Sequence, residues 1–229
     1  MEYKNSDFSA MVALSVGILA TGAAHAGTII YSDLGPSNAS AAAGYDVAGT
    51  AITCCGFQEV AAPFTPSSNF QFGQIDIALF NTGSPAFGDA NSVVLTLNSD
   101  SNGLPGSVLE SWTLTGMPNA FTPDTVQTVS ASAPLTLSSG VQYWVVASPE
   151  SSNSDNDWAE NSVGVFSGTD VAFNSGSGFF VFGYGNWEEP AFDVQAWSSP
   201  EPGTLALDTI ALLALGIGAF AKRSWILVH

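Results

Sequence analysis

The chain has 229 residues, of which 20 are acidic and only 3 are basic, so its formal net charge at pH 7 is −17. The basic residues Lys4, Lys222 and Arg223 lie near the ends, and the stretch from Asp33 to Glu201 holds 17 acidic residues with no Lys, Arg or His. Nucleic acids and anionic surfaces are bound mainly through Lys and Arg, so this composition excludes nucleic acid as a partner.

The first 26 residues have the pattern of a secretory signal peptide. Lys4 lies in a short polar start, and an apolar stretch follows from Phe8 to Ala24. Ala24-His25-Ala26 then places small residues at the two positions that signal peptidase reads. We therefore expect a signal helix, cleavage after Ala26 and export by the secretion machinery.

The two cysteines, Cys54 and Cys55, are adjacent in the sequence. Consecutive Cα atoms lie about 3.8 Å apart, whereas an ordinary disulfide needs roughly 4.4–6.8 Å. The pair can therefore form only a strained ring, bridge two chains or remain as free thiols. Without a His partner they make a poor zinc site, and no function is predicted for them.

The composition of residues 27–198 favours strands over helices. Short segments rich in β-branched and aromatic residues alternate with turn residues, and no long segment has helical periodicity. We predict an all-β domain here, an antiparallel β-sandwich of jelly-roll type. The predicted strands are Phe70–Phe72 leading into Ile75–Phe80, Val93–Leu97, Val108–Leu114, Val126–Ser130, Tyr143–Ala147, Phe179–Phe182 and Phe192–Trp197.

Three segments of this domain resemble a group of small extracellular domains called choice-of-anchor domains. The segments are Gln58–Pro66, Asn102–Gly106 followed by Leu109–Trp112, and Leu137–Trp144. The resemblance implies an extracellular sandwich fold. It brings no established catalytic residues with it.

Two acidic segments are candidates for calcium binding, the only cofactor that we consider. The first places oxygen side chains at alternate positions before Gly103, as calcium loops do. The same residues are also well suited to a hairpin turn. The second is predicted to be an acidic loop, with the same two interpretations. The candidate ligands are Asn98, Asp100 and Asn102 in the first segment, and Asp155 and Asp157 in the second.

The tryptophans suggest sugar binding, because an exposed indole can stack on a sugar ring. Most tryptophans in a sandwich of this size fill the core instead. Trp158, beside Asp157, and Trp187, beside two glutamates, are the ones that we expect to be exposed. These two are the candidates for stacking.

No catalytic constellation is predicted. The domain has no His or Lys, so it lacks the base that a Ser or Cys nucleophile needs. Glycoside hydrolysis requires only two carboxyl groups, and it remains the less favoured alternative. We expect the protein not to be an enzyme.

The C-terminal segment has three parts in order. Pro200-Glu201-Pro202-Gly203 precedes an apolar run over 204–221, and Lys222 and Arg223 follow it. As a helix, the run would be about 27 Å long, enough to cross a thin bilayer. The basic pair would stay in the cytoplasm and leave the domain outside. Taken alone, the run could instead be a core helix.

This order of motif, apolar helix and basic cluster resembles the PEP-CTERM sorting signal of Gram-negative bacteria that make exopolysaccharide. The resemblance implies recognition by an exosortase-like membrane protease that cuts near Pro200, Glu201, Pro202 and Gly203, after which the body is released or attached at the cell surface. We therefore divide the chain into a signal peptide (1–26), an extracytoplasmic domain (27–198) and a sorting tail (199–229). The expected function is that of a non-enzymatic surface or extracellular-matrix protein of the biofilm. The alternative is a carbohydrate-binding module for exopolysaccharide.

Overall fold

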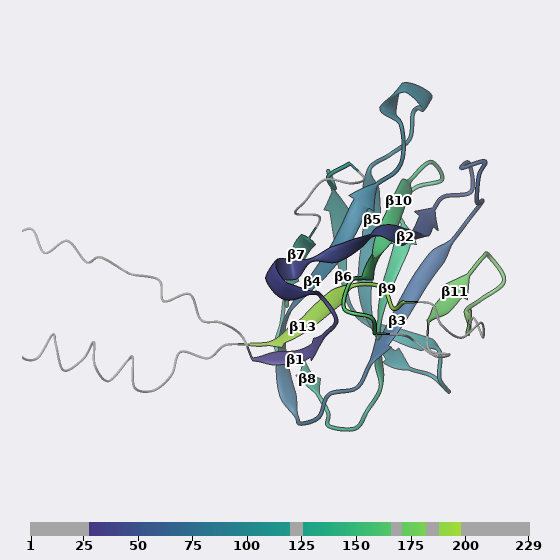
Figure 1. The fold of residues 1–229 in the computed structure, drawn as a ribbon. Coiled ribbons are helices and arrows are strands. Elements are labelled where there is room, and N and C mark those ends of the chain that lie inside the picture. The colour runs from purple at the N-terminus through teal and green to yellow at the C-terminus, as the bar shows by residue number, and fades with distance from the viewer. Residues whose placement is uncertain (1–27, 120–125, 166–170, 182–187, 198–229) are drawn as a thin grey trace, which may run out of the picture.

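A computed structural model describes residues 28–119, 126–165, 171–181 and 188–197, and their strands form two antiparallel sheets packed face to face (Figure 1). The structure confirms the prediction of an all-β fold with antiparallel sheets, consistent with a β-sandwich. No helix within the described ranges is long and apolar enough to cross a membrane. The predicted signal peptide and the predicted span over 204–221 lie outside these ranges.

The seven-stranded sheet is organised around its longest strand, β4, which pairs with β13, β10, β7 and β8. Strand β1 extends the sheet beyond β13, and β2 extends it beyond β10. The bounds are β1 Ile29–Ser32, β2 Ser40–Ala48, β4 Phe70–Asn81, β7 Val126–Ser130, β8 Thr136–Leu137, β10 Asp155–Asn161 and β13 Phe192–Ala196.

The six-stranded sheet has the order β12-β11-β3-β9-β5-β6. Two short 3-10 turns, η1 Pro36–Asn38 and η2 Pro85–Phe87, lie in connections between strands. The strand bounds are β3 Glu59–Phe64, β5 Ser92–Asp100, β6 Pro105–Thr115, β9 Tyr143–Pro149, β11 Ala172–Asn174 and β12 Phe180–Val181.

The core between the sheets follows from the alternation of side chains along each strand. In β4, Ile75, Ile77 and Leu79 are fully buried in the main apolar cluster, together with Val93 and Leu95 of β5. Full burial of one such side chain contributes about 1.5–3 kcal/mol relative to exposure. The core therefore provides the rigid frame on which the surface residues are placed.

One segment predicted to be an acidic loop is instead an internal strand. Strand β10 pairs with β2 on one side and with β4 on the other. Asn156 and Trp158 are fully buried, whereas Asp155 and Asp157 lie on the opposite face and are partly exposed. The loop prediction was wrong because polar residues were taken as a turn signal, although their alternation with buried residues has the period of a strand.

The two ends of the described domain lie side by side. Strand β1 pairs with β13, and the Ala196 amide donates a hydrogen bond to the Thr28 carbonyl at 2.8 Å. In Figure 1 the start of β1 and the end of β13 lie at the left, while β11 lies at the opposite side of the domain. A chain attached through its C-terminal end would therefore present β11 away from the attachment point.

Candidate functional site

A pocket of about 300 Å³ opens beside β2, and we call it the edge pocket. Among the described strands, β2 pairs with β10 alone, and β12 and β11 begin the strand order of the other sheet, so the pocket lies where the two sheets meet at an edge. Its lining combines four aromatic rings, a carboxylate, an amide and a hydroxyl. The lining residues are Gly44, Tyr45, Asp46, Cys55, Phe57, Gln58, Phe173, Ser175 and Phe180.

Two aromatic rings form the inner part of the edge pocket. Tyr45 and Phe173 are buried, their ring centroids lie 5.5 Å apart, and their planes are inclined by 58°. The Tyr45 hydroxyl donates a hydrogen bond to the Glu188 carbonyl, which fixes the ring. Phe180 is 45% exposed, so it forms part of the rim. The pocket therefore has two almost fully buried rings in its inner wall and one partly exposed ring at its rim.

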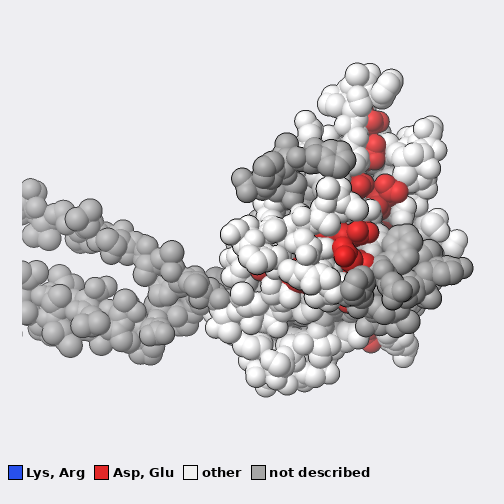
Figure 2. Space-filling view, in the orientation of Figure 1, with Lys and Arg blue, Asp and Glu red and all other residues white. Residues whose placement is uncertain are grey.

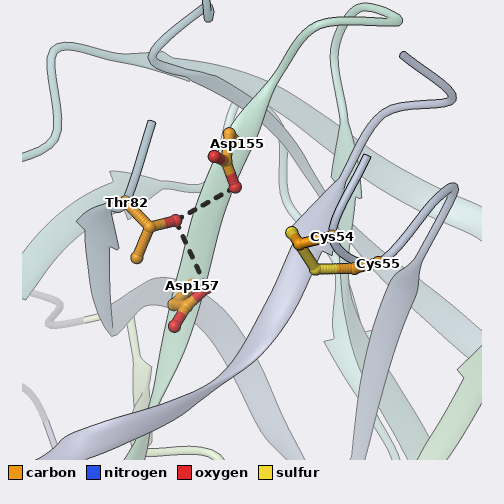
Figure 3. The surroundings of a disulfide bond; sticks show 5 residues. All are labelled: Cys54, Cys55, Thr82, Asp155 and Asp157. Atoms are coloured by element: carbon orange, nitrogen blue, oxygen red, sulfur yellow. Dashed lines mark hydrogen bonds between the residues drawn. A yellow bond between two sulfur atoms is a disulfide. The ribbon is translucent and has the colours of Figure 1, made fainter. Parts of the chain in front are cut away.

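The connection between β2 and β3 forms a further wall. Cys54 and Cys55 are joined in a disulfide, so the strained-ring alternative is the one that the structure shows (Figure 3). The Ala51 amide donates to the Ser152 carbonyl at 2.7 Å, and the Gly56 amide donates to the Ile52 carbonyl at 2.9 Å. Main-chain hydrogen bonds and the disulfide thus both hold this wall in place.

Three carboxylates, Asp46, Asp155 and Asp157, lie on the adjacent strands β2 and β10, and we call them the acidic ridge; of the three, Asp46 also lines the edge pocket. Asp46 lies opposite Asp157 in the pairing of β2 with β10, and the two carboxyl groups share a hydrogen bond. The Thr82 hydroxyl lies 3.1 Å from an oxygen of Asp155 and 3.4 Å from one of Asp157. Figure 3 shows β2 running between the acids of β10 and the disulfide.

Burial and like charges perturb the acidic ridge. Desolvation, with the Asp46 charge as the next cause, raises the pKa of Asp157 to about 7. Desolvation also raises the pKa of Asp155. In Figure 2 acidic side chains gather in a band over the region of β10 and β2, and no basic residue appears on this face. The described ranges contain no Lys, Arg or His, so no described side chain brings positive charge to the ridge.

The Asp46–Asp157 pair does not provide the geometry of a known two-carboxylate hydrolase. Retaining glycosidases hold their two carboxyl groups about 5–5.5 Å apart, and inverting enzymes hold them roughly 6.5–9.5 Å apart. Asp46 and Asp157 are within hydrogen-bonding range of each other. The pair is too close for either arrangement.

The first candidate calcium segment forms the hairpin turn between β5 and β6. One Asp100 oxygen accepts hydrogen bonds from Trp144 Nε1 at 2.9 Å and Gln142 Nε2 at 3.1 Å, and the other accepts from the Gly103 amide at 3.1 Å. Asn98 donates to the Gly106 carbonyl at 3.0 Å. Asn102 has φ 58°, as the turn requires. These contacts favour the turn interpretation.

The second candidate calcium pair, Asp155 and Asp157, belongs to the acidic ridge. Within the part of the chain that the structure describes, no group of three or more His, Cys, Asp or Glu side chains is arranged to hold a metal ion. The candidate ligands from the two segments are not brought together.

The prediction that Trp158 is exposed and can stack on a sugar ring is wrong. Its side chain is fully buried, and Nε1 donates to the Ala191 carbonyl at 3.0 Å. Trp187 lies outside the described residues. Trp197 is instead 57% exposed, in a hollow of about 380 Å³ lined also by Gln71, Phe72 and Pro134. This hollow offers one polar side chain, so it has little with which to orient sugar hydroxyls.

A second group of carboxylates is buried near β1 and β13, at the edge of the seven-stranded sheet opposite β2. The Tyr31 hydroxyl lies 2.6 Å from Glu189 Oε2 and 3.2 Å from Asp33 Oδ2, and the Phe192 amide donates to Asp33 Oδ1 at 2.6 Å. Desolvation raises the pKa of Asp33 to about 8. Because Asp33 is only 2% exposed, its carboxyl group is not open to a ligand.

Comparison of the chain with protein-family models, with curated proteins and with solved structures finds no match. The edge pocket therefore has to be interpreted from its own chemistry. Sequence reasoning missed its aromatic residues, because Tyr45, Phe57, Phe173 and Phe180 come from four separate segments. The adjacent cysteines just before Phe57 were the one local feature of the sequence that marked this pocket.

Proposed function

We propose that this protein is an exported, non-enzymatic surface or extracellular-matrix protein whose jelly-roll-like domain binds a sugar unit of an exopolysaccharide. The edge pocket is the observation that supports this function. Pockets of about 300 Å³ and more hold small ligands through apolar walls and a few placed polar groups. The edge pocket has both, in its four rings and in Asp46, Gln58 and Ser175.

The position of the pocket supports a role at a surface. The proposed sorting tail, with its motif at Pro200, Glu201, Pro202 and Gly203, follows β13 in the sequence, whereas β11 lies on the far side of the domain (Figure 1). Strand β11 carries the pocket residue Phe173. A tail that passes to an exosortase-like protease at the membrane would leave the pocket facing outward.

Two further features support export. The disulfide between Cys54 and Cys55 is a bond that forms and persists in oxidising compartments outside the cytoplasm. The sequence pattern up to Ala26 is that of a signal peptide. Both agree with a domain that is transiently anchored by its C-terminal helix and then resides at the cell surface.

Affinity electrophoresis tests the binding function. The exported protein, isolated from the producing cells, is run through gels containing increasing amounts of the cells' exopolysaccharide. We expect retardation that weakens in Phe180→Leu and is unchanged in Phe87→Leu. Phe87 is a matched control, because it is 86% exposed in η2 and does not line the pocket. Absence of retardation at high polymer concentration would contradict the binding function.

Mass spectrometry of the exported protein tests the sorting proposal separately. We expect an N-terminus at Gly27 and a C-terminus that is cut or modified near Pro202. Recovery of the intact chain with both Met1 and His229 would contradict the proposal.

A further inference from the structure

The hollow beside Trp197 lies at the end of the domain from which the C-terminal chain leaves. The Trp197 amide donates to the Gln71 carbonyl at 2.7 Å, and the Phe72 amide donates to the Leu135 carbonyl at 2.8 Å. Main-chain hydrogen bonds therefore fix both walls of the hollow. Phe72 is fully buried, so Trp197 is the aromatic ring that the hollow presents to its surroundings.

Apolar side chains are exposed at this end of the domain. Trp197 is 57% exposed just after β13, and Ile29 is 56% exposed at the start of β1, opposite Gln195 of β13. Pro134, which also lines the hollow, is exposed as well. A Trp side chain joins a large apolar ring to a polar N–H group, and it is enriched where a membrane meets water for that reason.

The charges at this end differ from those of the rest of the protein. Residues 28–32, 70–75, 130–137 and 194–197 contain no Asp or Glu, although the chain holds 20 acidic residues. Further along β4 and β13, Asp76 and Asp193 are only 7% and 6% exposed. Glu110 reaches this end, where it accepts hydrogen bonds from the amide and the hydroxyl of Ser132. Contact with a surface here would therefore remove few free charges from water.

The length of the following chain limits what this end can face. Six residues, 198–203, separate Trp197 from the apolar run over 204–221, which is the proposed membrane span. Fully extended, the chain from Trp197 to residue 204 covers at most about 25 Å. The polar interface of a bilayer adds roughly 5–8 Å on each side of its hydrocarbon core. With the span in a membrane, this end of the domain stays within reach of the lipid headgroups.

We propose that, while the tail anchors the protein, the Trp197 hollow docks on the headgroup region of the membrane that holds the tail. The occupant is a lipid surface of low net charge, since a protein of net charge −17 is repelled by anionic lipids. Because the tether is short, even a weak contact is populated. This inference rests on the proposed anchoring, and it adds a membrane contact that would keep the sorting motif at the bilayer surface.

Tryptophan fluorescence in vesicles tests the inference. The uncut exported form, residues 27–229, is inserted into phosphatidylcholine vesicles whose acyl chains carry bromine near the headgroups, which quenches a nearby indole. Trp225 follows the proposed span, so it is first replaced in a Trp225→Phe background. We expect lower emission than in unbrominated vesicles, and we expect most of this loss to disappear in Trp197→Gln.

A second variant moves the indole to the other end of the domain. Phe87 is 86% exposed in η2, beyond the end of β4 that is remote from Gln71. The ten residues from Gln71 to Asn81 place these ends about 34 Å apart. In the Trp197→Gln background, Phe87→Trp should therefore show no quenching by the brominated lipid. Equal quenching of indoles at positions 197 and 87, or no change in Trp197→Gln, would overturn the inference.

Flotation of the vesicles and resistance to alkaline extraction separate the two levels of the proposal. Anchored protein whose Trp197 is not quenched would overturn the membrane contact and leave the anchor in place. A second copy or a membrane protein seated in the hollow would give this same result in vesicles of lipid alone. Protein that neither floats nor resists extraction would overturn the anchor, and the inference with it.

The circular dichroism spectrum of Trp197→Gln provides the folding control. The side chain is more than half exposed, so an unchanged spectrum is expected. Loss of quenching in a folded variant then reports the missing contact.

Discussion

Asp46 lies directly opposite Asp157 across the antiparallel pairing of β2 with β10, and the two carboxyl groups share a hydrogen bond. Like charges in this position destabilise a sheet, and the described domain contains no cation to offset them. The pair is tolerated because a carboxyl group can hold a proton when burial raises its pKa.

This pair makes stability depend on pH. The pKa of Asp157 in the folded protein is raised to about 7, above its value in the unfolded chain of about 3.9. The stabilisation is therefore complete below about pH 4 and is lost as the pH rises through about 7. We expect the melting temperature to fall between about pH 5 and pH 8.5, and to fall less in Asp157→Asn. Thermal unfolding followed by circular dichroism checks this, and an equal fall in both proteins would contradict it.

Tyr31→Phe tests the buried carboxylates. The substitution removes the hydroxyl that donates to Glu189 and Asp33, and leaving a buried acceptor without its donor costs about 1–3 kcal/mol. We expect a loss of about this size in the free energy of unfolding, measured in urea. Tyr143→Phe is the control, because among the described residues its hydroxyl accepts a hydrogen bond from the neutral Ser138 amide and contacts no carboxyl group. A loss in Tyr31→Phe no greater than in the control would argue against the role of this group.

Truncation of Trp158 should lower the free energy of unfolding far more than truncation of Trp197. Trp158→Ala empties a fully buried site and is expected to cost about 3–5 kcal/mol. Trp197→Ala changes a side chain that is more than half exposed, so a change within about 0.5 kcal/mol is expected. Urea unfolding of the two variants checks this contrast. Similar losses would be inconsistent with their placement.

Asp100→Ala tests the hairpin interpretation of the first candidate calcium segment. The substitution leaves the indole N–H of Trp144, a side chain only 1% exposed, without its acceptor, at a cost of about 1–3 kcal/mol. Asp100→Asn keeps one acceptor oxygen and should lose less. We expect the same losses in calcium and in EDTA, measured by thermal unfolding. A calcium-dependent rise in melting temperature that Asp100→Ala abolishes would restore the calcium interpretation.

Replacement of both cysteines by serine should affect the pocket more than the fold. Cys55 lines the edge pocket, whereas the amides of Ala51 and Gly56 hold the same connection by main-chain hydrogen bonds. We expect weaker retardation in exopolysaccharide gels and an unchanged circular dichroism spectrum. Unchanged retardation would show that the disulfide wall does not contact the ligand.

The strands that could be predicted from the sequence are those in which apolar side chains alternate or cluster. Strands β4, β5, β6, β7, β9, β12 and β13 were found in this way, and β7 has the predicted bounds, Val126–Ser130. Strand β2 was missed because Ala41, Ala42 and Ala43 give no strand signal. Its structure comes from pairing with β10, which involves residues more than a hundred positions away.

The edge pocket could not be predicted, because its residues are brought together only by tertiary packing. Phe173 and Phe180 lie on short strands, and their partner Tyr45 lies in the Ala-rich strand that was missed. The predicted exposure of Trp158 was wrong for a related reason. Trp158 is next to acidic Asp157 in the sequence, but its side chain points to the opposite, buried face of β10. Neighbours along a strand face opposite sides, so a polar neighbour says little about the exposure of a side chain.

The side-by-side ends of the domain have a mechanical consequence. A polymer held at β2 and a tail held beyond β13 would apply tension across the sheet, through β10 and β4, which connect these two strands. The ladder hydrogen bonds and the apolar core would resist that force together. Under the proposed function, the domain would then be a stiff link in which the pairing of β10 with β4, which covers only Leu79–Asn81, is the shortest ladder along the path of the force.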